Sequence, residues 1–74
     1  MLWQELRMLQ TLHFVRQTQD YEPADQMREF EASSGGLRQW LGRLLRDGLV
    51  TQNARSVWRV TAKGDAFMAR KRSF

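Results

Sequence analysis

One continuous stretch in the middle of the chain decides the fold, and it reads Leu37-Arg38-Gln39-Trp40-Leu41-Gly42-Arg43-Leu44-Leu45-Arg46-Asp47-Gly48-Leu49-Val50. Its apolar residues recur at the spacing of one face of an α-helix, at Leu37, Trp40, Leu41, Leu44 and Leu45. The opposite positions carry three arginines and a glutamine. Glycine at position 48 is typical of the left-handed residue that ends a helix. The stretch therefore predicts a helix with one face in a core and an arginine-rich face outside.

Two short strands and a closing helix are expected after this stretch. Residues 49–52 and 56–61 have the short, partly alternating pattern of half-buried strands, and Asn53-Ala54-Arg55 joins them like a hairpin. Thr61 then suits the cap of a last helical stretch. The chain closes with a basic end at 68–74. This end either contacts backbone phosphate or is a solvated tail.

Before residues 37–50 we expect a short helix and then a bend in the chain. Residues 32–36 read Ala-Ser-Ser-Gly-Gly, and their glycines permit a sharp bend while their serines can cap the next helix. Pro23 suits the first turn of a helix, where its missing N–H costs nothing. Residues 23–31 are therefore predicted to form a short helix with Met27 and Phe30 facing inward.

A longer amphipathic helix is predicted for residues 2–17, which contain neither glycine nor proline. Four residues on it follow helical spacing and are expected to face the core, with Leu12 and Val15 widening the stripe: Leu2, Leu6, Leu9 and His13. His13 is the only histidine, so it is interpreted as a residue at the edge of the core and not as a metal ligand.

Length and composition narrow the possible classes of protein. The chain has 74 residues and no cysteine, so we expect one domain over residues 1–74 without disulfides or cysteine-bound zinc. No apolar run approaches the ~18 residues of a membrane span. A cytoplasmic protein that is neither a large enzyme nor a membrane protein is expected. Asp20, Glu22 and Asp25 are clustered, but no nucleophile, histidine partner or metal-ligand spacing accompanies them, so we predict no catalysis, no cofactor and no metal.

The net charge of +4 is unevenly distributed along the chain. Residues 1–37 contain three cations and six acids, whereas residues 38–74 contain nine cations and two acids. Ten of the twelve cations are arginine. Such a split favours a basic surface that meets a polyanion, although it also fits a solvated surface. We expect the acidic first half to face away from that surface.

The order of these elements predicts a helix-turn-helix over residues 23–47, followed by a two-stranded wing over residues 49–61. The second helix, residues 35–47, would lie in the major groove of double-stranded DNA, and the wing would contact the backbone or the minor groove. Arginine can pair with guanine and glutamine with adenine, so these residues are chemically suited to reading bases. The predicted DNA-binding residues are Ser34, Arg38, Gln39, Arg43, Arg46, Arg55, Arg59 and Lys63.

Two segments carry a resemblance to a known family. They are Leu37-x-x-Trp40-Leu41-x-x-Leu44-x-x-x-Gly48-Leu49-Val50 and Trp58-Arg59-Val60-Thr61-x-Lys63-Gly64. The chain resembles the winged helix-turn-helix family of bacterial regulators, especially its MarR-like and PadR-like branches, over roughly residues 4–68. The resemblance implies an α+β, mostly helical fold with three helices, a two-stranded wing and a short C-terminal helix. It also implies sequence-specific DNA binding by a small bacterial, plasmid or phage-type transcriptional regulator.

The chain departs from this pattern near the turn. Glu31 stands where the family often has glycine, and Gly35-Gly36 occupies positions that usually bear Ser, Thr or Arg. A different class of function also stays open, namely a winged-helix interaction module or adaptor that binds an acidic protein partner through the same arginines. A homodimer is a further possibility. Its surface would be the first helix, the segment around Phe67, or another face.

Overall fold

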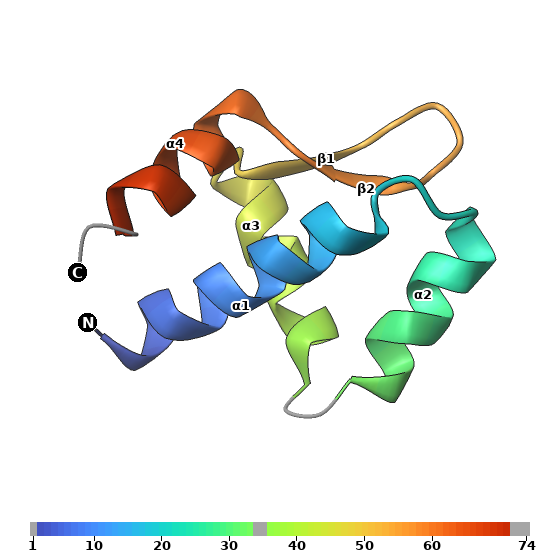
Figure 1. Ribbon diagram of the computed structural model, residues 1–74, viewed down its shortest axis with the longest axis horizontal. Coiled ribbons are helices and arrows are strands. Elements are labelled where there is room, and N and C mark those ends of the chain that lie inside the picture. Colours follow the sequence, from blue (N-terminus) through green and yellow to red (C-terminus); the bar gives the residue numbers. More distant parts are fainter. Residues whose placement is uncertain (1, 34–35, 72–74) are drawn as a thin grey trace.

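The structure is a computed structural model that describes residues 2–33 and 36–71. The chain forms a mostly helical α+β domain with one two-stranded antiparallel sheet. In chain order its elements are α1 (Trp3–Thr18), α2 (Pro23–Ala32), the 3₁₀ helix η1 (Leu37–Trp40), α3 (Leu41–Arg46), β1 (Val50–Gln52), β2 (Trp58–Val60) and α4 (Ala62–Lys71). Helix α1 crosses the middle of the molecule, with α3 behind it, α2 at one end, and the hairpin and α4 along the top (Figure 1).

The core gathers between α1, the η1–α3 segment, the hairpin and α4. Its buried apolar members are Met8, Leu12, Val15, Phe30, Leu37, Leu41, Leu44, Leu49, Val50 and Met68. The prediction that Phe30 faces inward is confirmed, and its ring packs against Phe14 of α1 with 4.7 Å between the ring centroids. Trp40 and Trp58 are half-buried and pack against this core.

Helix α1 turns only part of its predicted stripe to the core, since Leu12 and Val15 are buried and Leu9 packs against the core. Its buried residues are Met8, Thr11, Leu12, Val15 and Thr18. Leu2 and Leu6 are 68% and 40% exposed, and His13 is exposed as well, so the prediction that they face the core is wrong. The helix has apolar residues on two sides, and the packing of η1, β2 and α4 decides which side is buried.

The single helix predicted for residues 35–47 is wrong, because the helical segment spans residues 37–46 and has two parts. It begins as η1 and becomes an α-helix only at Leu41. Gly36 precedes η1 in a left-handed conformation with φ 67°, which glycine adopts without strain, so it does not weaken the helix interior. Ser34 and Gly35 lie outside the described residues. Leu45 is 44% exposed, so the prediction that it faces inward is wrong.

The end of α3 confirms the cap predicted at Gly48. This glycine has φ 78°, and its N–H donates to the carbonyl of Leu45 at 3.0 Å. The next N–H, that of Leu49, donates to the carbonyl of Leu44 at 2.9 Å. These two bonds form a Schellman motif, in which the reversal of the chain also satisfies carbonyls at the end of the helix. The motif directs the chain from α3 into β1.

Thr61 links the end of the sheet to the start of α4 through hydrogen bonds of its hydroxyl, as expected for the predicted cap. Its hydroxyl accepts a hydrogen bond from the N–H of Gly64 at 3.0 Å and donates to the carbonyl of Gly48 at 2.6 Å. Gly64 is buried against the start of β1, where a Cβ atom would lie 2.2 Å from the carbonyl oxygen of Leu49. The motif Thr61-x-Lys63-Gly64 therefore builds a tight junction between α3, the hairpin and α4.

Two glutamines cover the outer edge of the hairpin. In the sheet Val50 pairs with Val60, and Gln52 pairs with Trp58, which leaves the far side of β2 without a neighbouring strand among the described residues. The fully buried Gln26 of α2 donates to the carbonyl of Trp58 at 2.9 Å and accepts from its N–H at 2.8 Å. Gln19 accepts from the N–H of Val60 at 3.4 Å. The side-chain amide of Gln26 thus pairs with β2 as a neighbouring strand would.

Candidate functional site

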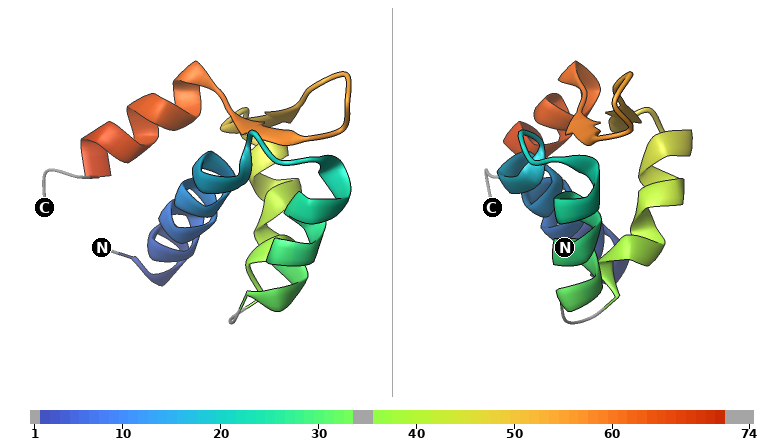
Figure 2. Two further views of the ribbon diagram at one scale, coloured as in Figure 1. Left: turned by 45° about the vertical axis from the view of Figure 1, so that its right-hand side comes forward. Right: turned by 90° about the vertical axis from the view of Figure 1, so that its right-hand side faces the viewer.

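The η1–α3 segment presents polar side chains on an uncovered side. Its inward residues Leu37, Leu41 and Leu44 are buried, whereas the polar residues Arg38, Gln39 and Arg46 are exposed. In the right-hand view of Figure 2 the segment stands at one margin of the molecule, and no other described element covers its outer side. The predicted separation of an apolar face from an arginine-rich face is therefore present in the folded chain.

Two arginines of this segment lie near a carboxylate, and Gln39 lies against Gly36. Arg38 lies 3.4 Å from a carboxylate oxygen of Glu31 at the end of α2. Arg43 lies 3.8 Å from Asp47, and its guanidinium is 5.9 Å from the ring centroid of Trp40. The amide of Gln39 lies over Gly36, where a Cβ atom would be 3.5 Å from the amide carbon.

The hairpin arginines contact the turn between α1 and α2. Arg55 forms an ion pair with Glu22, and Arg59 lies 3.6 Å from Asp20 while donating to the carbonyl of Gln19 at 3.3 Å. The acidic residues of the first half were expected to face away from the basic surface. That expectation is wrong, because the hairpin packs beside the α1–α2 turn and places these carboxylates against its arginines.

These ion pairs leave the arginines available to another anion. The side chains of Arg38, Arg55 and Arg59 are each at least two-fifths exposed, and so are the carboxylates that they contact. Exposed ion pairs typically contribute only ~0–1 kcal/mol, because water and salt screen them. A phosphate oxygen can therefore compete with each carboxylate for its arginine.

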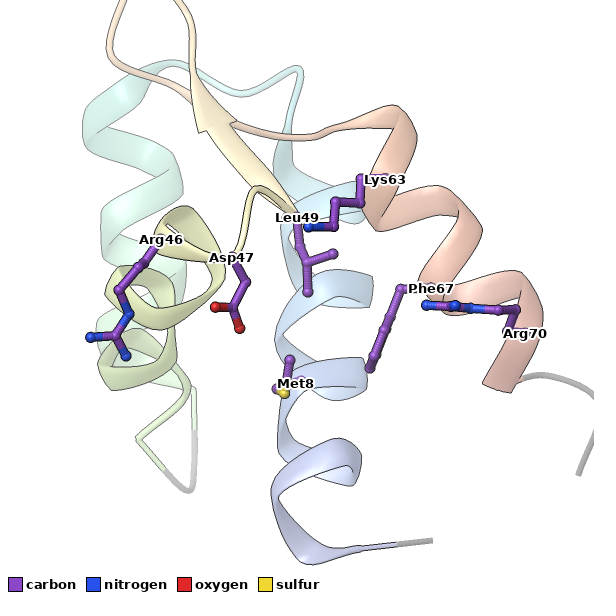
Figure 3. Close-up of a pocket in the computed structure, with 7 residues that line it drawn as sticks. All are labelled: Met8, Arg46, Asp47, Leu49, Lys63, Phe67 and Arg70. Carbon is purple, nitrogen blue, oxygen red and sulfur yellow. The ribbon is translucent and has the colours of Figure 1, made fainter.

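Arg46 and Lys63 differ from the other predicted cations because neither has an ion-pair partner within the described part of the chain. Both line an open depression of about 440 Å³ between α3, α1 and α4, whose floor includes Met8 and Phe67 (Figure 3). The side chain of Lys63 lies beside Gly48, and its Cδ atom is 3.7 Å from the position that a Cβ atom on this glycine would take. Among the candidate cations, these two are therefore the least neutralised by nearby carboxylates.

The structure thus divides the predicted residues into three groups. One lies along η1–α3, one lies on the hairpin beside the α1–α2 turn, and Lys63 lies with Arg46 at the depression. Ser34 is outside the described residues, as is the 72–74 part of the basic end. Within that end, Lys71 pairs with Glu5, and Arg70 lies 6.0 Å from the ring centroid of Phe67.

Sequence reasoning missed the acidic partners and one exposed apolar side chain. Asp20, Glu22 and Glu31 are close to the arginines only because the hairpin and α2 fold toward them, and no local spacing signals this. Leu45 lies exposed on the helix that carries the arginines. Within residues 2–33 and 36–71 no group of three or more acidic or histidine side chains is placed to hold a metal ion, and no helix is long and apolar enough to cross a membrane.

No family model matches the chain, and searches of curated proteins and of solved structures gave no significant match. The residues of this chain and their geometry are therefore the basis on which its function can be argued.

Proposed function

We propose that this protein binds double-stranded DNA sequence-specifically as a small cytoplasmic transcriptional regulator of the winged helix-turn-helix type. Helix α2 and the η1–α3 segment would form the helix-turn-helix, and the β1–β2 hairpin would form the wing. The observation that carries the proposal is the η1–α3 segment itself. It buries its leucines and leaves Arg38, Gln39 and Arg46 on a side that no other described element covers.

The chemistry of each group supports a distinct role. Arg38 and Gln39 lie in the first turn of the segment, where side chains of a recognition helix reach base edges. Arg43 lies half-buried one turn later, and Arg46 and Lys63 are suited to phosphate because they carry positive charge without an acidic partner among the described residues. Arg55 and Arg59 would contact the backbone or the minor groove beside the wing.

A salt titration tests the proposal. We expect the affinity of the intact chain for duplex DNA, measured by fluorescence anisotropy, to fall steeply as salt rises, because each phosphate contact releases counterions. Arg46→Gln and Lys63→Gln should each reduce the slope of log K against log salt by ~0.9. Arg38→Ala should cost about 1–3 kcal/mol on the preferred sequence and relax the preference. Arg7→Gln on α1 is the control and should leave the slope unchanged.

One result would contradict the proposal outright, namely the absence of salt-dependent binding by the intact chain. A second observable locates the interface. On adding duplex DNA, amide NMR shifts should concentrate in residues 36–46 and 53–59, and shifts confined to residues 2–31 would contradict the assigned face.

The acidic partners give a further prediction for DNA binding. Glu22→Gln should strengthen DNA binding about two- to fivefold at low salt. Arg55 would no longer have to break its ion pair with Glu22 before it binds a phosphate, and the negative charge of Glu22 would no longer repel the DNA. Glu29→Gln is the matched control, since Glu29 is exposed on α2 without an ion-pair partner among the described residues. Equal affinities for Glu22→Gln and the unmodified chain would show that the pair does not oppose binding.

A second candidate function is binding to an acidic protein partner. The observation that favours it is that four arginines of the candidate face, Arg38, Arg43, Arg55 and Arg59, already contact carboxylates. A protein carboxylate could replace these intramolecular partners without any new chemistry. Shifts confined to residues 2–31 on adding a protein partner, with none on adding DNA, would favour this function.

A further inference from the structure

The depression between α3, α1 and α4 is bordered by cations from two elements. Lys63, Phe67 and Arg70 follow one another along α4 at intervals of four and three residues, so they share the side of this helix that lines the depression. Arg46 stands on α3 at the opposite margin (Figure 3). None of these three cations forms an ion pair within residues 2–33 and 36–71.

One carboxylate, that of Asp47, also lines the depression. It lies 3.8 Å from Nε of Arg43, which neutralises part of its charge. Three cations against one partly neutralised carboxylate leave the depression positively charged. Such a site attracts an anion more strongly than a neutral or a cationic molecule.

The floor of the depression is apolar, in contrast to its margins. Met8 and Leu49 are buried there, and the ring of Phe67 is half-buried beside them. An aromatic group packs favourably against a methionine sulfur and against another ring. The volume of about 440 Å³ also falls within the ~300–1,000 Å³ that is usual for small-molecule sites. A ligand with a flat apolar body can therefore cover this floor, which a bare inorganic anion would leave exposed.

We propose that the depression binds a phosphate monoester that carries a flat, apolar body. The phosphate would contact Lys63 and Arg70, and the body would lie over Met8 and Phe67. At pH 7 a phosphate monoester has a charge of about −1.5 to −2, so it matches several cations better than a carboxylate, which has a single charge. Each phosphodiester of a DNA backbone also has a single charge and carries no apolar body. The proposal concerns a free small molecule and does not depend on DNA binding.

An NMR titration of the full chain with 1-naphthyl phosphate, in the absence of DNA, tests the site. We expect saturable amide shifts that concentrate in residues 46–49 and 63–70, with a dissociation constant on the order of 0.1–1 mM for so small a ligand in an open site. 1-Naphthoate has the same body but a single charge, and it should bind at least ~3-fold more weakly. Inorganic phosphate lacks the body and should also bind at least ~3-fold more weakly.

Charge variants of the lining residues provide a second measurement. Lys63→Gln and Arg70→Gln should each raise the dissociation constant of 1-naphthyl phosphate at least ~3-fold, because each removes a cation that would contact the phosphate. Asp47→Asn should lower it about two- to threefold, because the carboxylate at the depression is removed. The matched control is Arg28→Gln, which removes the same charge from an exposed site on α2 and should leave the affinity unchanged.

Four results would overturn the proposal. The first is the absence of saturable shifts, and the second is their concentration in residues 36–45 or 53–59, where the ligand would bind the arginines of η1–α3 and the hairpin instead. The third is equal affinity for 1-naphthoate and 1-naphthyl phosphate. The fourth is a loss of affinity in Arg28→Gln as large as that in Lys63→Gln. Circular dichroism on each variant separates loss of the ligand from loss of the fold, and DNA binding is measured in a separate experiment.

Discussion

Replacing Gly64 by alanine should destabilise the fold more than any other single methyl addition at a glycine among the described residues. The new Cβ atom would lie 2.2 Å from the carbonyl oxygen of Leu49 and 2.8 Å from Cγ1 of Val60. The first contact is with backbone, so no side-chain rotation relieves it. That carbonyl also accepts the N–H of Thr61 at 3.1 Å. Moving α4 away from the Leu49 carbonyl would therefore open the junction between the hairpin and the last helix.

The expected cost is about 3 kcal/mol or more, the upper range for forcing extra volume into a packed site. A domain of this size has only ~5 kcal/mol of stability, so the midpoint of urea denaturation should fall by more than half. Circular dichroism against urea concentration measures this. An unchanged midpoint for Gly64→Ala would show that α4 does not need to lie this close to β1.

Gly42→Ala is the matched control for that experiment. Gly42 lies exposed in α3, and beyond its chain neighbours and the backbone of its own helix no atom lies within 4 Å of the position of a Cβ atom there. Alanine there should stabilise the protein by roughly 0.5–1 kcal/mol, because glycine loses more conformational entropy in a helix. The same chemical change is thus expected to have opposite effects at positions 42 and 64, depending on the space around each glycine.

The parts of the fold that depend on neighbours in sequence could be predicted. Gly48 ends α3, Thr61 caps α4 and Phe30 faces inward, as expected, because caps and helical spacing act over a few residues. The start of the 37–46 segment was predicted less well. Its first turn is a 3₁₀ helix, and the competition between 3₁₀ and α geometry at a helix end leaves little trace in the residue types.

Features that depend on distant packing could not be predicted. Leu6 and Leu12 were both predicted to lie on the core-facing stripe of α1, and only the placement of the other elements decides that Leu12 is buried while Leu6 is exposed. The pairing of Arg59 with Asp20 joins residues 39 positions apart. For the candidate site, the residue types and the helix that carries most of them were predictable. It was not predictable which of the arginines form ion pairs with carboxylates.

Gln26 illustrates the same limit, and its replacement should be the second most damaging change. A glutamine in a polar helix attracts no attention in the sequence, yet its amide satisfies both backbone groups of Trp58, which lies 32 residues away. It also donates to the hydroxyl of Thr18 at 3.2 Å. Gln26→Leu keeps a similar volume but removes all three bonds. The hydroxyl of Thr18 keeps its bond to the carbonyl of Phe14 at 2.9 Å. Leaving the N–H and the carbonyl of Trp58 unpaired should cost about 3 kcal/mol, at 1–3 kcal/mol for each unsatisfied group.

Gln26→Glu separates the acceptor from the donor at this site. The carboxylate can still accept the N–H of Trp58, but it faces the Trp58 carbonyl where the amide donated at 2.9 Å. Burial and this carbonyl favour the protonated form, so the pKa of the introduced carboxyl should be higher in the folded than in the unfolded chain. Its stability is then closest to that of the unmodified protein below the ordinary glutamate pKa of about 4.3.

The stability difference between Gln26→Glu and the unmodified protein should therefore widen as the pH rises from about 4 towards neutrality. Urea denaturation of both proteins at each pH measures this difference directly and cancels the titration of all other groups. Gln17→Glu provides the control, since Gln17 is exposed on α1 and the same change there should show almost no dependence on pH. A constant difference across this range would mean that the side chain at position 26 reaches water, and that it does not substitute for a strand beside β2.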